Sequence, residues 1–171
     1  MTVDSKFKIR LAKNEDFEEV YAIWLEGISS SFDTSALEKI VVYEKFRNNF
    51  LKRSGIFNYW IAVSEENEVA GWQSLNKCTV NPIKENHFAE SSTYVKKEAR
   101  KYGVGEFLLT YVTETAKAST LQYITAYVTA ENTAIRAITS KLGFVEIGVL
   151  PSNSKTKQTT MKNKIFIIKP L

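Results

Sequence analysis

The sequence has 171 residues, of which 44% are hydrophobic and 25% charged, and its formal net charge is +4. A chain of this length fits one domain, over residues 1–171, that buries a sizeable core. The positive charge is spread along the chain, which favours a solvated surface over a nucleic-acid partner, and no apolar stretch approaches the roughly 18 residues of a membrane span.

Residues that bind metals or form disulfides are scarce. Cys78 is the only cysteine and His87 the only histidine. A single cysteine cannot form an internal disulfide, and one cysteine with one histidine cannot build a zinc site, so we expect no metal. We interpret both as loop or strand-edge residues. Met1–Arg10 lacks the apolar segment of a secretory signal, so we expect a cytoplasmic protein.

The first third of the chain predicts one strand and two helices. Side chains alternate between apolar and polar over residues 7–11, as in a strand. Asn14 resembles an N-cap, and apolar side chains then recur at helical spacing until Gly27 and the serines 29–31. A less regular second helix reaches residue 50, with a possible capping box at Ser35-x-x-Glu38.

The middle third predicts three strands and a helix. The strands cover residues 59–63, 69–75 and 87–95, and a hairpin turn at Glu65–Asn67 joins the first two. The helix is expected to start near Glu106. Its expected buried face comprises Phe107, Leu108, Tyr111, Val112 and Thr115.

The last third predicts a strand over residues 123–128, a short helix and two closing strands over 144–150 and 165–168. Asn132 is expected to cap the helix, and Gly143 to end it in a left-handed conformation. Residues 152–163 are polar, and we expect them to form a loop over the active site. These patterns alone indicate a mixed α/β or α+β fold.

The most informative stretch runs from Glu90 to Gly105, where a strand leads through a basic, glycine-containing turn into a helix. A helix start presents unpaired N–H groups and a partial positive charge, and glycines allow a ligand to approach the backbone. With Arg100 and Lys101 beside them, Gly103 and Gly105 predict a pyrophosphate cradle. The alternative is an ordinary tight turn. Leu108 breaks the G-x-G-x-x-G pattern, and no Gly-Lys-Ser/Thr follows, so dinucleotides and nucleoside triphosphates fit poorly.

Two signatures in this chain resemble those of the GCN5-related N-acetyltransferase (GNAT) superfamily. Arg100-x-x-Gly103-x-Gly105 after a strand is similar to the acetyl-CoA signature, with Lys97 in place of the usual proline, and Asn132-Thr133-Ala134 with Leu142-Gly143-Phe144 is similar to the second signature. The resemblance implies a mixed, mostly antiparallel sheet flanked by about four helices. It also implies acetyl-CoA as co-substrate. The residues expected to bind it are Thr93, Tyr94 and Val95 through their backbone, Arg100, Lys101, Tyr102, Gly103, Val104 and Gly105 in the turn, and Asn132.

A closer resemblance is to the phosphinothricin N-acetyltransferase subgroup, carried by Glu90-Ser-Ser-Thr-Tyr-Val95, Ser30–Thr34 and Gly71-Trp72. It implies that Glu90 is the general base, that the acceptor is a small amino acid or an analogue, and that the protein is a homodimer. The apolar third and last strands are candidate interfaces. From the strand alone, Glu90 could instead pair with a lysine or face solvent.

Further residues remain open at this stage. Phe32 and Trp72 either line the acceptor pocket or belong to the core. Thr139 stands where the subgroup has a histidine, and no tyrosine occurs between Asn132 and Phe144, so the general acid is unassigned.

The function we expect is transfer of an acetyl group from acetyl-CoA to the primary amine of a small molecule. Two alternatives remain: a catalytically silent acyl-CoA-binding sensor, and an acetyltransferase of peptide or protein N-termini. The 152–163 loop would narrow the site against a polypeptide.

Overall fold

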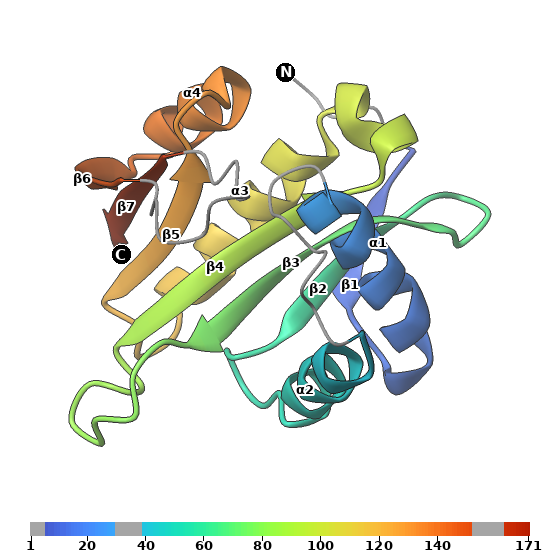
Figure 1. Ribbon diagram of the computed structural model, residues 1–171, viewed down its shortest axis with the longest axis horizontal. Helices are drawn as coiled ribbons and strands as arrows, with labels where there is room; N and C mark the ends of the chain where they lie inside the picture. Colours follow the sequence, from blue (N-terminus) through green and yellow to red (C-terminus); the bar gives the residue numbers. More distant parts are fainter. Residues whose placement is uncertain (1–5, 30–38, 152–162) are drawn as a thin grey trace.

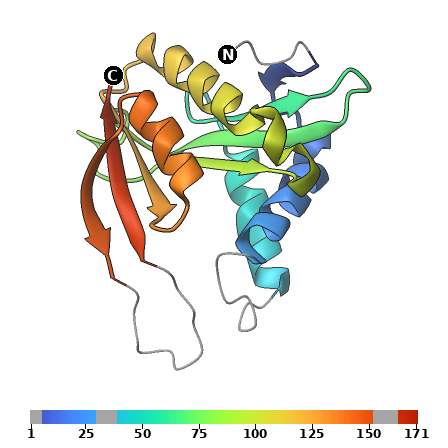
Figure 2. The ribbon, with the colours of Figure 1, turned by 90° about the horizontal axis from the view of Figure 1, so that it is seen from above.

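The computed structural model describes residues 6–29, 39–151 and 163–171, which form a seven-stranded sheet with helices on both faces (Figures 1 and 2). In chain order the elements are β1 (Lys8–Leu11), a 3-10 helix η1 (Asn14–Asp16), α1 (Phe17–Ser29), α2 (Lys39–Leu51), β2 (Tyr59–Val63), β3 (Val69–Lys77), β4 (Phe88–Val95), a second 3-10 helix η2 (Lys97–Tyr102), α3 (Val104–Lys117), β5 (Tyr123–Thr129), α4 (Thr133–Lys141), β6 (Val145–Leu150) and β7 (Lys164–Pro170). This order confirms the predicted one and adds the two 3-10 helices. The Ser35 capping box lies outside the described residues.

The strand order in the sheet is β1-β2-β3-β4-β5-β7-β6. Every neighbouring pair is antiparallel except β4 and β5. The sheet is therefore mixed and mostly antiparallel, as predicted. β3 is buried between β2 and β4, and β7 lies between β5 and β6. Neither strand is at an edge, so neither can pair edge to edge with a strand of a second copy.

The two faces of the sheet bury separate hydrophobic cores. On one face, α1 and α2 pack aromatic side chains such as Phe17 and Phe50 against β2 and β3, which contribute Tyr59 and Trp72. On the other, α3 and α4 cover a mainly aliphatic core that includes Leu108, Ile124 and Ile167. Alternate residues of one strand serve opposite cores, because successive side chains of a strand point to opposite faces.

The buried face of α3 differs from the predicted one. The residues that it buries are Val104, Leu108, Leu109, Val112, Thr113 and Ala116, whereas Tyr111 is 44% exposed. The helix begins at Val104, two residues earlier than expected, and its aliphatic stripe packs on the sheet. The larger aromatic residues Phe107 and Tyr111 lie toward the outer side of the helix.

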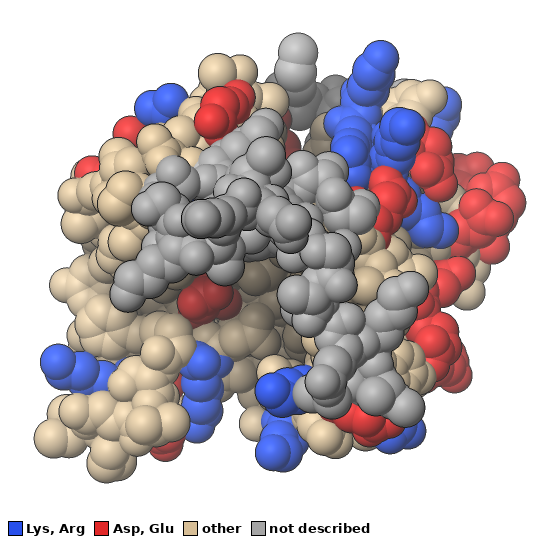
Figure 3. Space-filling model, in the orientation of Figure 1, with Lys and Arg blue, Asp and Glu red and all other residues tan. Residues whose placement is uncertain are grey.

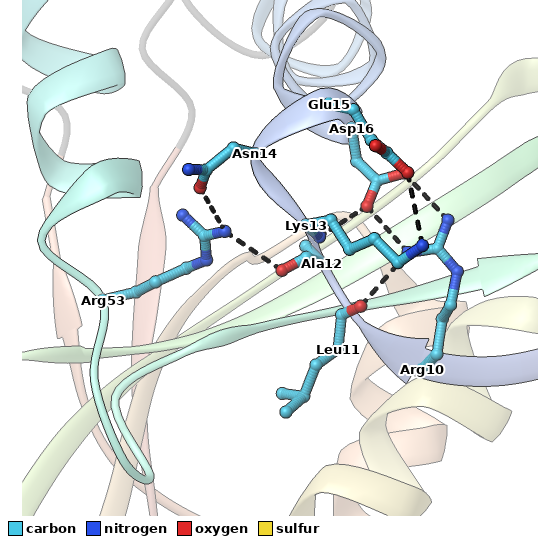
Figure 4. A network of polar contacts seen from close by, with 8 residues as sticks. All are labelled: Arg10, Leu11, Ala12, Lys13, Asn14, Glu15, Asp16 and Arg53. Carbon is cyan, nitrogen blue, oxygen red and sulfur yellow. Dashed lines mark hydrogen bonds and ion pairs between the residues drawn. The ribbon is translucent and has the colours of Figure 1, made fainter.

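A polar network fixes the start of α1 (Figure 4). The carboxylate of Asp16 accepts hydrogen bonds from the Arg10 guanidinium at 2.7 and 2.9 Å and from the backbone N–H of Lys13 at 2.6 Å. Arg53, just after α2, donates to the carbonyl of Ala12 and to the Asn14 side chain. The network ties β1, α1 and the end of α2 together, so the helical layer is held in place against the sheet.

Candidate active site

The parallel strands β4 and β5 part halfway along their length. Their pairing runs from Phe88 with Tyr123 to Glu90 with Thr125 and ends there. Beyond that point the two strands enclose a cavity of about 410 Å³. Residues that line it come from β4 and β5 and from helices on both faces of the sheet: Gly27, Glu90, Ser91, Ser92, Thr93, Tyr94, Leu109, Ala126, Tyr127, Val128, Thr129, Asn132, Ile135, Thr139, Phe144, Leu150 and Lys164. The cavity therefore passes between the strands and can receive one ligand from each face.

Along this cavity, the backbone N–H and C=O groups of successive β4 residues point alternately toward β3 and toward the cavity. Lys96 donates its N–H to Ala70 of β3 at 2.9 Å, so in this antiparallel pair Tyr94 also directs its backbone groups to β3. Thr93 and Val95 accordingly direct theirs toward the cavity side. The Val95 carbonyl accepts a hydrogen bond from Arg100 at 3.1 Å. Of the three expected backbone contacts, those of Thr93 and the N–H of Val95 are placed to meet a ligand, and those of Tyr94 are not.

The turn between β4 and α3 is the short helix η2, closed by Gly103 with a φ of +74°. That φ disfavours any residue with a Cβ, and a Cβ there would enter open space, with nothing within 4 Å. The turn leads directly to the first N–H groups of α3. Basic side chains of 96–101 gather around it at the top of the molecule in Figure 3. This open backbone with positive surroundings fits the pyrophosphate of coenzyme A.

The residues of the turn contribute unequally. Val104 is fully buried, while Lys101 and Tyr102 are exposed. Arg100 is exposed, but its guanidinium is tied to the protein surface, since it donates to Glu26 of α1 at 3.1 Å as well as to Val95. Glu26 also accepts the N–H of Lys97 at 2.9 Å. Arg100 and Glu26 thus hold the turn against α1.

Glu90 lies at the point where β4 and β5 part, with Asn76 of β3 on one side and Thr125 of β5 on the other. Its side chain is partly buried, and this burial raises the pKa of the carboxyl above its ordinary value. Among the described residues, no lysine or arginine forms an ion pair with it. A partly desolvated, unpaired carboxylate in a cavity is suited to accept a proton.

A buried polar network behind the cavity wall was missed in the sequence. Gln73 of β3 is fully buried, its amide donates to Ser91 Oγ at 2.5 Å, and Thr93 Oγ1 donates to its carbonyl oxygen. The network fixes two side chains that line the cavity. Its signal was a glutamine directly after the apolar run Val69–Trp72, which indicates a buried group with a partner on a neighbouring strand.

The aromatic residues near the cavity are placed differently from the prediction. Trp72 is 1% exposed, donates its indole N–H to the Val20 carbonyl at 2.9 Å and does not line the cavity. It packs behind Tyr94, which does line it, with ring centroids 4.9 Å apart. A Cβ on Gly27 would lie 2.3 Å from the Tyr94 ring, so only glycine leaves room for it. Phe32 lies outside the described residues.

The cap of α4, Asn132, and two residues of the helix, Ile135 and Thr139, line the cavity on the other face. Asn132 accepts the N–H of Ile135 at 3.2 Å, which confirms its predicted role as the cap of α4. Thr139 is buried, and its hydroxyl is hydrogen-bonded to carbonyls of its own helix. No group of three or more His, Cys, Asp or Glu side chains suited to a metal occurs in the described part of the chain. That part also contains no helix long and apolar enough to cross a bilayer.

Comparisons with known proteins agree with this geometry. Residues 17–144 match the "Acetyltransferase (GNAT) family". The chain therefore belongs to this family and is an N-acetyltransferase, with acetyl-CoA as its acetyl donor.

Individual relatives share less than a third of their residues with this chain. Over 143 residues, which cover 84% of this chain and 86% of the relative, the sequence is 28% identical to the Bacillus subtilis (strain 168) protein named "Putative phosphinothricin acetyltransferase YwnH". A phosphinothricin acetyltransferase from Sinorhizobium meliloti, solved in complex with AcCoA, has a TM-score of 0.79 at 20% identity and covers 97% of this chain and 89% of its own. A ribosomal-protein-alanine N-acetyltransferase from Brucella melitensis has a TM-score of 0.77 at 23% identity, with coverage of 96% and 99%. At these identities the two structures show the shared fold.

Proposed function

We propose that this protein acetylates the primary amine of a small molecule, an amino acid or an amino-acid analogue, with Glu90 as the general base. The observation that carries the proposal is the position of Glu90, a partly buried carboxylate that lines the cavity between β4 and β5. The names of relatives such as the Bacillus subtilis protein support the class of acceptor.

The residues of the chain would divide the work between the two faces of the sheet. N–H groups of the turn at Gly103 and of the first turn of α3 bind the pyrophosphate, and the backbone of Thr93 and Val95 binds the pantetheine arm. Acetyl-CoA supplies an activated acetyl group. The Val95 or Thr93 N–H stabilises negative charge that develops on the acetyl oxygen. Glu90 removes a proton from the acceptor ammonium and leaves the neutral amine that attacks.

The general acid is not a side chain of α4 in this scheme. Thr139 occupies the subgroup's histidine position, but a threonine hydroxyl bonded to its own helix is a weak acid. We infer that the proton given up by the amine returns to the thiolate through Glu90 or water.

The experiment that tests this proposal is Glu90→Gln, which preserves shape and removes the proton acceptor. We expect turnover to fall by roughly 10² to 10⁴ at neutral pH, the usual contribution of a general base, with acetyl-CoA affinity unchanged. The loss should shrink at high pH, where more of the amine is already neutral. Wild-type rates between pH 6 and 9 would contradict the assignment. A sensor, the alternative function, has no amine-dependent turnover to lose.

We also infer that residues 1–171 form one domain and that two copies pair through β6. This strand is the outer edge of the sheet, and Val145, Ile147, Val149 and Leu150 on it are 49–60% exposed. Glu146, the charged residue of the strand, is paired with Arg136. Native sheets usually protect such an edge with charges, and antiparallel pairing of β6 with a second β6 is self-complementary.

A further inference from the structure

We propose that Lys164 is a specificity-determining residue that binds the carboxylate of the acceptor, so that the site selects α-amino acids over polyamines and peptides. This proposal rests on the proposed function and names a feature of its acceptor. Lys164 begins β7 and was not singled out in the sequence. Among the described residues that line the cavity, Glu90 and Lys164 are the two that carry a full charge, and the charges are opposite.

The strand register places both residues on one face of the sheet. Glu90 is the partner of Thr125 on β5, and Lys164 is the partner of Thr129 on the same strand. Residues 125 and 129 are separated by an even number of positions, so their side chains point to the same face. The ammonium of Lys164 donates to Thr129 Oγ1 at 2.9 Å, which directs the lysine toward β5.

Opposite charges in one cavity suit a zwitterion. Glu90 and Lys164 both line the cavity and project from the same face of the sheet, so an acceptor bound between them meets an anion and a cation. An amino acid carries the complementary ammonium and carboxylate.

The charges of Glu90 and Lys164 would distinguish three classes of acceptor: α-amino acids, polyamines and peptides. An α-amino acid presents its ammonium to Glu90 and its carboxylate to Lys164. A polyamine would bring a second cation to Lys164, and like charges repel. A peptide N-terminus has an amide where the carboxylate would be, and so loses the charge-assisted hydrogen bond.

The test compares Lys164→Gln with the wild type on the twenty standard amino acids and on their amides, which lack the carboxylate. With the preferred amino acid we expect KM to rise roughly 10- to 100-fold, the value of a hydrogen bond to a charged group, while kcat changes little. For the matching amide KM should stay the same. Lys164→Arg should restore the preference for the acid, and Lys164→Glu should shift it toward putrescine.

A matched control is Lys8→Gln, which removes the same charge from the edge strand β1, far from the cavity, and should leave both KM values unchanged. Equal losses with acid and amide in Lys164→Gln would assign Lys164 a structural role and overturn the proposal. So would an unchanged KM for the acid.

Calorimetry of the same amino acids with the CoA-bound protein separates this proposal from the proposed function. Amino-acid binding that is lost in Lys164→Gln supports the carboxylate site even if no turnover occurs. Failure of every amino acid to bind or react overturns it, and turnover of putrescine or a peptide would then still support acetyl transfer itself.

Discussion

At the scale of single residues, Glu90 combines a position suited to catalysis with an unfavourable electrostatic environment. Burial raises the pKa of its carboxyl, and no described cation compensates. An ionised carboxylate with a raised folded-state pKa lowers stability. The penalty is absent below the pKa of the unfolded side chain, about 4.3, and complete above the raised pKa of the folded one.

We therefore predict that Glu90→Gln, although nearly inactive, melts at or above the wild-type temperature at pH 7.5. The difference should shrink toward pH 4, where most of the wild-type carboxyl is protonated in both states. Thermal denaturation followed by circular dichroism at the two pH values measures it. Glu114→Gln is the control, because Glu114 lies in an exposed ion pair with Lys117 and should show no such gain. A Glu90→Gln variant that melts several degrees lower at pH 7.5 would show that the charge is stabilising.

At the scale of elements, the turn η2 and the start of α3 form the candidate pyrophosphate cradle. Gly103 has the left-handed backbone that this turn requires, and the space beside it is open. Gly55, in the loop before β2 and outside the cavity lining, offers a matched comparison, with a φ of +56° and equally open surroundings.

We predict that the affinity of Gly103→Glu for acetyl-CoA, measured by calorimetry, is more than roughly 100-fold lower than that of the wild type. The affinity of Gly55→Glu should be unchanged. Both variants impose a similar backbone penalty of about 1 kcal/mol, so both should fold with similar small losses of stability. Only at 103 does the new carboxylate meet the pyrophosphate, where like charges repel. Retained affinity in a folded Gly103→Glu protein would remove the cradle from this turn.

The edge strand β6 yields a second prediction at this scale. Val149 is 60% exposed, so Val149→Lys should not disturb the fold of one chain, but it would place a charge in the proposed interface. In light scattering we expect the wild type at twice the 19.5 kDa chain mass and the variant at that mass itself. Leu11→Lys on β1, the opposite edge strand, should remain dimeric. A wild-type monomer, or dimers in both variants, would rule out β6.

The elements were largely predictable because their signals are local. Alternation and turn residues placed the strands, and Asn132 and Gly143 marked the ends of α4. The buried face of α3 was not predictable, because two apolar stripes fit a helix equally well and the sheet selects one. The pairing of Arg100 with Glu26 joins residues that are 74 positions apart, and only the fold brings them together.

At the scale of the whole molecule, the site arises from the parting of β4 and β5. Glu90, Thr93 and Asn132 line the resulting cavity, and the roles that the motifs gave them stay predictions. Trp72 could have lined the pocket or belonged to the core, and the pleat directs it into the aromatic core. Lys164 was missed because its relation to Glu90 depends on the register of three strands.

The central claim is that this protein transfers acetyl groups to a small amine, and the most direct measurement is thiol release from acetyl-CoA with a panel of amino acids, polyamines and short peptides. Wild type and Glu90→Gln are measured side by side at pH 7.5. We predict amine-dependent thiol release with at least one amino acid, weaker release with polyamines and peptides, and a loss of roughly 10² or more in Glu90→Gln. Acetyl-CoA binding without release for any amine would contradict the claim and identify a sensor, and release with peptides alone would identify an N-terminal acetyltransferase.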